Sequence, residues 1–115
     1  MSGGDVALAP LPQADGRPKP RPVVLLCQMP PFDDWLVCGV STQLHQEVPG
    51  FDETIKPSHA DFRRSGLKAA SLIRLGFLAV LPEVQLHGRL GSIAPERHER
   101  LLQRLGAFLQ SKRKV

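Results

Sequence analysis

The sequence predicts a mainly β domain in which several short strands form a small barrel and one C-terminal helix covers it. The chain has 115 residues, which is the size of one domain with one hydrophobic core. Most of its apolar runs are short and end at prolines or glycines, as strands do. Only the segment after residue 94 carries apolar residues at helical period. We expect a single domain over residues 1–115, with residues 1–3 and 111–115 frayed.

The first part of the chain reads as three strands. Residues 5–11 form an apolar run interrupted by a proline, which is typical of a strand near the edge of a sheet. Residues 12–20 read as a loop, because they hold three prolines, a glycine and two basic residues. Residues 22–28 are apolar and partly β-branched, which predicts a buried central strand. A turn over residues 29–34 then leads into a strand over residues 35–40, as in a hairpin.

A long polar connection follows over residues 41–57. Within it, we expect a short strand to begin at Ile55 and to run toward residues 61–62. The pair Ser65-Gly66 marks a turn.

Two more apolar strands are predicted over residues 69–75 and 77–81. Gly76 lies between them and marks a bulge or a bend. Residues 82–86 predict a single helical turn, and residues 88–93 a last short strand or loop.

The clearest helix begins at Pro95, because proline suits the first helical position. Glu96 and Glu99 lie in its first turns, where the helix dipole favours negative charge. The apolar stripe comprises Leu101, Leu102, Leu105, Phe108 and Leu109, and Arg97, Arg100, Gln103 and Arg104 fall mainly off it. This stripe packs either against the barrel or against a second subunit.

Charge and cysteine content narrow the functional class. The formal net charge is +4, which suits a polyanionic partner such as RNA or an acidic peptide. The chain shows neither a secretory signal nor an apolar stretch long enough to span a membrane. We therefore expect a cytoplasmic protein without membrane contact, in which Cys27 and Cys38 are reduced, buried thiols.

Five short sequence motifs follow one another along the chain. They are Gly4-Asp5-Val6, Arg21-Pro22-Val23-Val24-Leu25, Val40-Ser41-Thr42, Ser65-Gly66-Leu67-Lys68 with Ser71-Leu72-Ile73-Arg74-Leu75, and Leu90-Gly91-Ser92 with Pro95-Glu96. In sequence and in order, these blocks resemble those of the MazF/PemK toxins of type II toxin-antitoxin systems. The similarity extends from Gly4 to Leu109.

The resemblance implies a homodimeric, SH3-like barrel with a C-terminal helix that cuts single-stranded RNA without a metal or other cofactor. In this family the substrate's own 2′-hydroxyl is the nucleophile, and the products carry a cyclic phosphate and a 5′-hydroxyl. A cognate antitoxin protein would occupy the RNA-binding groove and silence the toxin.

The resemblance also implies catalytic roles for Arg21, Ser41, Thr42 and Arg74. Arginine suits the transition state of phosphoryl transfer, because its planar fork stays charged and grips two phosphate oxygens. We place Arg21 at a loop-to-strand boundary, and Ser41 where the family has its catalytic threonine. Arg74 either binds phosphate or lies on an outer surface, and Gly76 stands where some members carry an aspartate acid or base.

Four residues of the two predicted loops are candidates for RNA binding: Arg17, Lys19, Gln43 and His45. His45 is also a candidate proton donor, whereas His87 and His98 read as surface residues. No histidine or cysteine has zinc-ligand spacing, so we expect no metal site.

The aromatic residues and the fold leave alternatives open. Trp35 is expected in the barrel core or a dimer contact, whereas Phe32 could either stack on an RNA base or have no role. The fold also admits a toxin directed at gyrase, or a barrel that binds RNA or protein without cutting it. Gly76 and the serine at position 41 allow these alternatives, whereas Arg21 and the neighbouring hydroxyls favour a ribonuclease.

Overall fold

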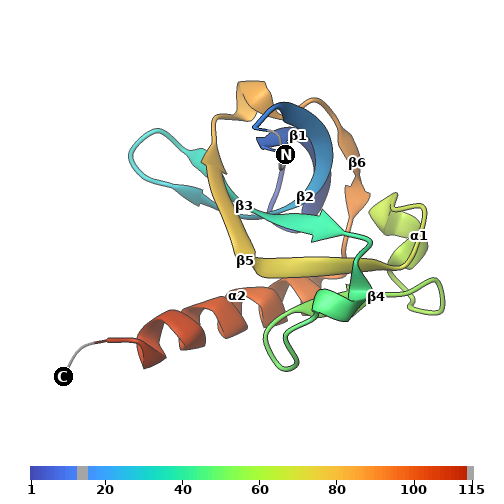
Figure 1. The fold of residues 1–115 in the computed structure, drawn as a ribbon. Helices are drawn as coiled ribbons and strands as arrows, with labels where there is room; N and C mark the ends of the chain where they lie inside the picture. Colours follow the sequence, from blue (N-terminus) through green and yellow to red (C-terminus); the bar gives the residue numbers. More distant parts are fainter. Residues whose placement is uncertain (13–15, 114–115) are drawn as a thin grey trace.

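The computed structural model describes residues 1–12 and 16–113 (Figure 1). The elements follow in the order β1 (Asp5–Pro12), β2 (Pro18–Met29), β3 (Asp34–Ser41), η1 (Leu44–Gln46), β4 (Glu53–Ile55), α1 (Phe62–Ser65), β5 (Ser71–Leu81), η2 (Glu83–Gln85), β6 (Arg89–Ser92) and α2 (Pro95–Ser111). The strands form one antiparallel sheet in the order β4-β5-β3-β2-β1-β6. The sheet curls into a half-barrel, and α2 lies along its outside (Figure 1).

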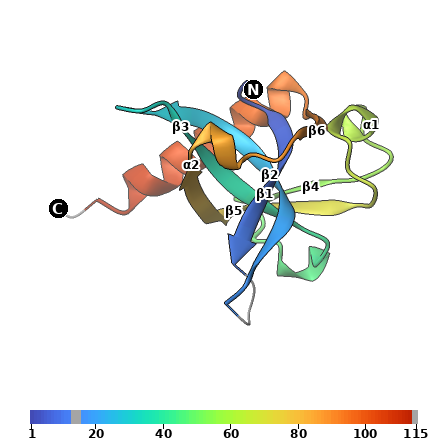
Figure 2. The same ribbon diagram turned by 90° about the horizontal axis from the view of Figure 1, so that it is seen from above.

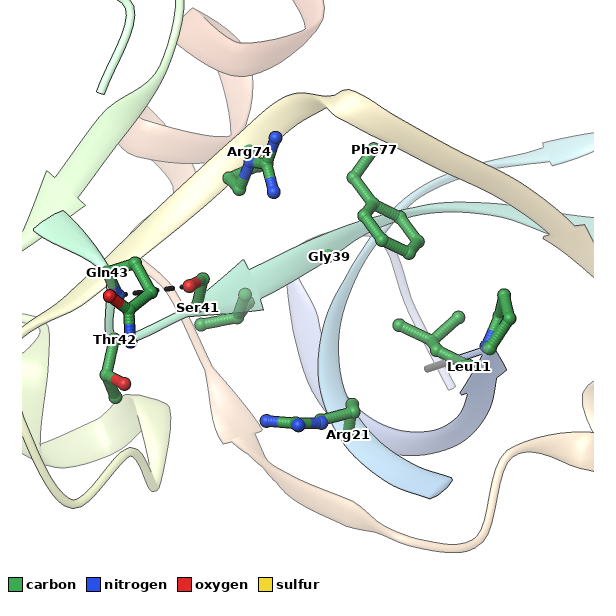
Figure 3. Close-up of a pocket in the computed structure, with 10 residues that line it drawn as sticks. Leu11, Arg21, Gly39, Ser41, Thr42, Gln43, Arg74 and Phe77 are labelled. Atoms are coloured by element: carbon green, nitrogen blue, oxygen red, sulfur yellow. Dashed lines mark hydrogen bonds between the residues drawn. The ribbon is translucent and has the colours of Figure 1, made fainter. Parts of the chain in front are cut away.

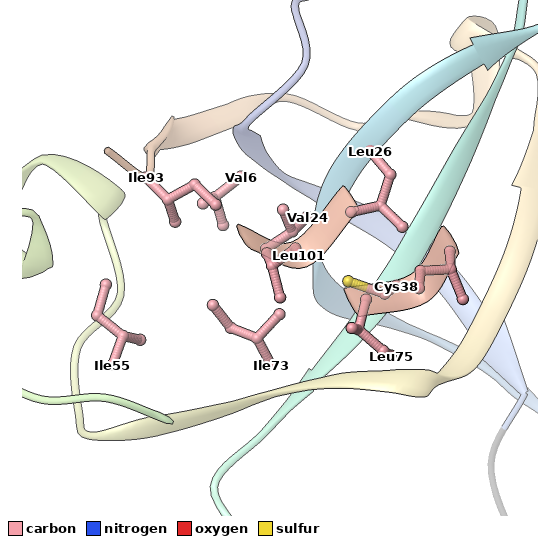
Figure 4. Packing of buried hydrophobic residues seen from close by; sticks show 10 residues of the cluster. Val6, Val24, Leu26, Cys38, Ile55, Ile73, Leu75, Ile93 and Leu101 are labelled. Carbon is pink, nitrogen blue, oxygen red and sulfur yellow. The ribbon is translucent and has the colours of Figure 1, made fainter. Parts of the chain in front are cut away.

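Residues 23–26 of β2 are buried on both faces of the sheet, which explains why this part of the strand is continuously apolar. Val24 and Leu26 belong to a cluster between the sheet and Leu101 of α2 (Figure 4). The alternate residues Val23 and Leu25 face the other way, into a second cluster with Ala9, Val37 and Trp35 on the side that the sheet encloses. The expected mainly β fold with a C-terminal helix is thus confirmed.

Trp35 is a core residue, with only 4% of its surface exposed, and its indole N–H donates to Glu83 Oε1 at 3.0 Å. Of the two thiols, Cys38 is fully buried, whereas Cys27 is only half-buried. None of the helices described has the length and apolar character needed to cross a bilayer.

β1 lies near the edge of the sheet, as expected: it is next to the edge strand β6, and its pairing with β6 stops at Ala7. The expectation of a loop over residues 12–20 is wrong in part. β2 begins at Pro18, so residues 18–20 are strand and not loop. They pair only with β1, since the pairing of β2 with β3 begins at Val23. Prolines at alternate positions fit such a one-sided strand, because their missing N–H groups all point to its unpaired side.

The strand expected to run from Ile55 toward residues 61–62 is also wrong. β4 ends at Ile55, because the chain turns at once: the Lys56 N–H donates to His59 Nδ1 at 3.0 Å and the His59 N–H donates to the Lys56 carbonyl at 2.8 Å. Residues 62–65 then form the short helix α1. The elements η2, β6 and α2 agree with the expectations, whereas the short helix η1 within the polar connection was not expected.

A single strand, β5, replaces the two expected around Gly76, and the expected bulge lies within it. Its pairing with β3 passes from Arg74 directly to Leu78, which leaves residues 75–77 without partners on β3. The Asp52 carboxylate accepts the free Leu75 N–H at 3.1 Å, and its other oxygen accepts the Val48 N–H at 2.9 Å. The buried Asp52 side chain therefore holds the bulge in place.

Two glycines explain why separate sequence blocks lie together. A side chain at Gly91 would overlap the Arg64 carbonyl oxygen, and one at Gly66 would overlap the Leu90 carbonyl oxygen. The end of α1 and the strand β6 therefore pack backbone against backbone, which only residues without a Cβ atom allow. Gly66 also needs a positive φ of 75° to end α1.

The apolar stripe of α2 divides between core and surface. Leu101 and Leu105 are buried, whereas Leu102, Phe108 and Leu109 are exposed. The C-terminal end of α2 extends beyond the sheet (Figure 2). His98, expected at the surface, is half-buried, and its Nε2 lies 2.8 Å from the Leu26 carbonyl oxygen.

Candidate active site

A pocket of about 280 Å³ opens at one end of the enclosed cluster, slightly below the usual volume of ligand sites, about 300–1,000 Å³. Its lining residues are Leu11, Pro12, Arg21, Gly39, Val40, Ser41, Thr42, Gln43, Arg74 and Phe77 (Figure 3). The structure thus brings together all four residues predicted to be catalytic and one of those predicted to bind RNA, Gln43.

The register of three strands places these side chains. Val23 of β2, Gly39 of β3 and Arg74 of β5 lie directly opposite one another, so they share one face of the sheet. Val23 is buried in the enclosed cluster, so this face points inward. Two residues further along, Arg21 and Ser41 continue the same face and emerge at the rim. Arg21 therefore lies within β2, opposite Ala9, and not at the loop-to-strand boundary that we expected.

The bulge in β5 adds a second side chain to this pocket. Arg74 and Phe77 are three residues apart, a spacing that would put them on opposite faces of a regular strand. Because residues 75–77 are out of register with β3, both side chains line the pocket instead.

The Ser41 hydroxyl accepts a hydrogen bond from the Gln43 N–H at 3.0 Å (Figure 3). A hydroxyl that accepts one bond keeps its own hydrogen for donation. Ser41 therefore both closes the local turn and can donate to a molecule in the pocket.

The charged residues described around the pocket are both basic. Arg21 and Arg74 line it, and no carboxylate does among the residues that the structure describes. Two guanidinium groups on paired strands, with a hydroxyl between the ends of those strands, form a set of donors that suits a phosphate group. Such donors stabilise negative charge that develops on that group.

Comparison with known proteins identifies the family of the chain and a solved structure with a similar fold. The family described as PemK-like, MazF-like toxins of type II toxin-antitoxin systems matches residues 2–109. The chain belongs to this family. The solved structure of Mycobacterium tuberculosis toxin MazF-mt6 is similar in fold, with a TM-score of 0.67 and 17% sequence identity over 92% of this chain and 96% of that one. No curated protein matches the chain.

Three of the sequence blocks that this MazF-like toxin shares with its family lie in the strands around the pocket. The block around Arg21 runs into the core of β2, Val40-Ser41-Thr42 ends β3, and the block with Arg74 forms the first part of β5. As a type II toxin, the protein has a cognate antitoxin.

Three of the residues predicted to bind RNA do not line the pocket: Arg17, Lys19 and His45. Lys19 is exposed on β2, two residues before Arg21 and on the same face of the strand. His45 is exposed in η1, two residues after Gln43. These cations and this imidazole therefore lie outside the pocket, along the segments that lead away from it.

The toxin contains a buried ionic cluster that the sequence patterns did not predict, and this cluster joins α2 to β4 and to the residue before α1. The Arg97 Nε and Nη2 groups donate to the two oxygens of Asp61 at 2.8 and 3.1 Å, and Nη1 donates to Glu53 Oε1 at 2.8 Å. Arg100 and Arg104 complete the cluster, with nitrogens 2.7 and 3.1 Å from Glu53 Oε2. We expected Arg97 mainly off the apolar stripe, yet it is in phase with Leu101 and Leu105, and that spacing is the signal for its burial.

The cluster keeps its carboxylates ionised. Burial raises the pKa of Asp61, but the hydrogen bonds from Arg97 and from the Ala94 N–H outweigh it, and the pKa falls to about 2. Burial likewise opposes the ionisation of Glu53, yet the hydrogen bond and charge of Arg100 bring its pKa below the ordinary value. Every guanidinium nitrogen of Arg97 has a partner, so this side chain serves structure.

Proposed function

We propose that this toxin is a metal-independent endoribonuclease that cleaves single-stranded RNA in the cytoplasm. The observation that carries the proposal is the pocket in which Arg21, Arg74 and the Ser41 hydroxyl meet on one inward face of the sheet. Family membership supports it, since these residues occupy the family's sequence blocks.

In the proposed reaction, the 2′-hydroxyl oxygen of the substrate attacks the adjacent phosphorus atom and the bond from phosphorus to the 5′-oxygen breaks. The products are a 2′,3′-cyclic phosphate and a 5′-hydroxyl. The 2′-oxygen loses a proton and the 5′-oxygen gains one, so there is no net change in protons. Among the described lining residues, only the hydroxyls of Ser41 and Thr42 can relay a proton, together with solvent.

Each residue has a role that follows from its position. Arg21 and Arg74 hold the non-bridging oxygens of the phosphate, where charge increases as the fifth bond forms. Ser41 and Thr42 donate hydrogen bonds to the same group. Gln43 binds the RNA beside this centre, and Arg17, Lys19 and His45 bind the parts of the strand that extend beyond the pocket.

The deciding assay incubates the folded protein with a long single-stranded RNA in excess EDTA and identifies the 5′ ends of the fragments. We expect discrete fragments with 5′-hydroxyls from the wild type. Arg21→Ala should cleave about 100- to 1,000-fold more slowly, as when one fixed donor to a transition state is lost. Arg63→Ala removes an exposed arginine on α1, outside the pocket, and should cleave like the wild type.

Intact RNA in every reaction, with protein shown to be folded, would contradict the nuclease proposal and favour a gyrase-directed or non-catalytic toxin. Equal rates for Arg21→Ala and the wild type would instead show that the pocket is not the catalytic centre.

The proposal also includes a homodimer whose antitoxin covers the pocket. The exposed Leu102, Phe108 and Leu109 give α2 an apolar surface suited to a second copy. Light scattering at micromolar concentration should give the mass of two chains, and the mass of one chain would contradict the dimer. An acidic antitoxin segment would complement Arg21 and Arg74, so adding it should protect the RNA in the assay above.

A further inference from the structure

The pocket has two chemically different ends. Ser41, Thr42, Gln43 and Arg74 lie at one end, and Figure 3 shows Phe77 and Leu11 at the other, with the Arg21 side chain between them. The apolar end contains no donor or acceptor side chain among the residues described there, so it contributes nothing to binding a phosphate group. An apolar surface beside two guanidinium groups indicates that this end binds a part of the ligand other than its phosphate group.

Phe77 dominates this apolar end, and two features hold its ring there. The bulge over residues 75–77 turns the side chain inward, as described above. Gly39 then provides the surface on which the ring rests, because a Cβ atom at this position would lie 3.2 Å from Phe77 Cγ. The ring packs partly on the enclosed cluster and is only half-buried, so part of it faces the pocket.

We propose that Phe77 is a stacking platform for one nucleobase of the substrate, namely a base next to the phosphate that Arg21 and Arg74 hold. This inference rests on the proposed function, because it assigns a second part of the same ligand to the same pocket. A nucleobase has a flat π-face that stacks on aromatic side chains, and unpaired bases in single-stranded RNA are free to do so. Leu11 forms the apolar wall beside this platform.

The platform selects for a nucleobase but not for which one. Every base has a π-face, so stacking on phenylalanine is tolerant of sequence. Phe77 therefore contributes affinity and fixes the position of the phosphate relative to the two arginines. Gly39 acts through Phe77 as a positioning residue, because any side chain there would displace the ring.

The test measures binding without cleavage. The first probe is a short, fluorescently labelled single strand of mixed sequence with 2′-O-methyl groups, which lacks the nucleophile. The second probe has the same length and phosphate charge but no bases. Dissociation constants for both probes are measured by fluorescence anisotropy with wild type, Phe77→Leu, Phe77→Tyr and Gly39→Ala. Phe32→Leu is the matched control. The sequence left a stacking role for Phe32 open, but this residue is 81% exposed on the turn at the opposite end of β2 and β3 from Arg21 and Ser41, and it does not line the pocket.

We expect Phe77→Leu to weaken binding of the base-bearing probe by at least about fivefold, the lower end of what loss of one aromatic stack produces. Its affinity for the probe without bases should stay within about twofold of the wild type. Phe77→Tyr keeps the ring and should behave like the wild type. Gly39→Ala should reproduce the selective loss to a smaller degree, and Phe32→Leu should change neither affinity. Thermal melts of each variant show that these effects occur in folded protein.

Three results would overturn the inference. Unchanged affinity of Phe77→Leu for the base-bearing probe means that no base stacks there. Equal weakening for both probes means that Phe77 only maintains the shape of the pocket. Absence of saturable binding by the wild type removes the platform altogether. In all three cases the cleavage assay with Arg21→Ala still decides the proposed function separately.

Discussion

Replacing Arg97 with methionine would show how much the buried ionic cluster contributes to folding. The side chain keeps a similar length but loses every donor to Asp61 and its bond to Glu53. Glu53 retains Arg100 and Arg104, whereas Asp61 retains only the backbone N–H of Ala94 and its own backbone. Most of the cost therefore falls on Asp61, whose side chain is only 5% exposed.

The shifted pKa of Asp61 and the usual cost of breaking a buried ion pair set the size of the effect. Asp61 has a pKa of about 2 instead of 3.8, and this difference corresponds to about 2 kcal/mol of stabilisation for the ionised form. Without Arg97 the burial that opposes ionisation remains, so the loss is larger than this. Removing one partner of a buried ion pair typically costs about 3–5 kcal/mol. We expect a loss in this range, a large fraction of the roughly 5–15 kcal/mol that stabilises a domain.

Urea unfolding followed by the fluorescence of Trp35 measures this loss, because the chain has one tryptophan and it is buried. The matched control is Arg100→Met, which removes two hydrogen bonds to the same Glu53 from a side chain that is 46% exposed. Its cost should be about 1 kcal/mol, as for a largely solvated pair. If Arg97→Met costs no more than Arg100→Met, then the cluster does not hold α2 to β4 and the reasoning fails.

Three further predictions concern acid stability, backbone packing and thiol reactivity. The pKa of Asp61 is lower in the folded protein than in the unfolded chain, so its contribution to the free energy of unfolding is complete above about pH 4 and should disappear as the pH falls toward 2. Urea midpoints measured between these pH values should fall less steeply for Asp61→Asn than for the wild type. Gly91→Ala should destabilise the fold by about 1–3 kcal/mol in the same assay, whereas Gly106→Ala, with open space around it on α2, should stabilise it by up to about 1 kcal/mol. Burial raises the pKa of the Cys38 thiol to about 12, so a thiol reagent at pH 8 should label the half-buried Cys27 in the native protein and Cys38 only after unfolding, as mass spectrometry of the peptides would show. Native labelling of Cys38 at the rate of Cys27, or equal effects of the two glycine variants, would contradict the corresponding packing.

The sequence by itself determined the features that depend on neighbours along the chain. The run after Arg21 identified a buried strand, residues 29–34 identified a hairpin turn, and Pro95 with its following stripe identified α2. Local patterns suffice for these elements because period and turn chemistry act over a few residues. The ordered family blocks also identified the fold, since they combine such signals over the whole chain.

Only the tertiary structure decided how the site is assembled. The register of three paired strands puts Arg21, Gly39 and Arg74 on one face of the sheet. The sequence pattern of a single strand does not reveal which residues of its neighbours lie opposite it. The prolines at positions 18 and 20 indicated a loop, but a strand with one free side accommodates them. The sequence did not indicate that Phe77 lines the pocket, because the orientation of this side chain depends on the bulge in β5. In that bulge the Leu75 N–H donates to the Asp52 carboxylate, which is distant in the sequence. Arg97 is likewise buried only because β4 and the segment before α1 bring Glu53 and Asp61 next to it. A charged side chain is buried only where oppositely charged partners compensate for the loss of water.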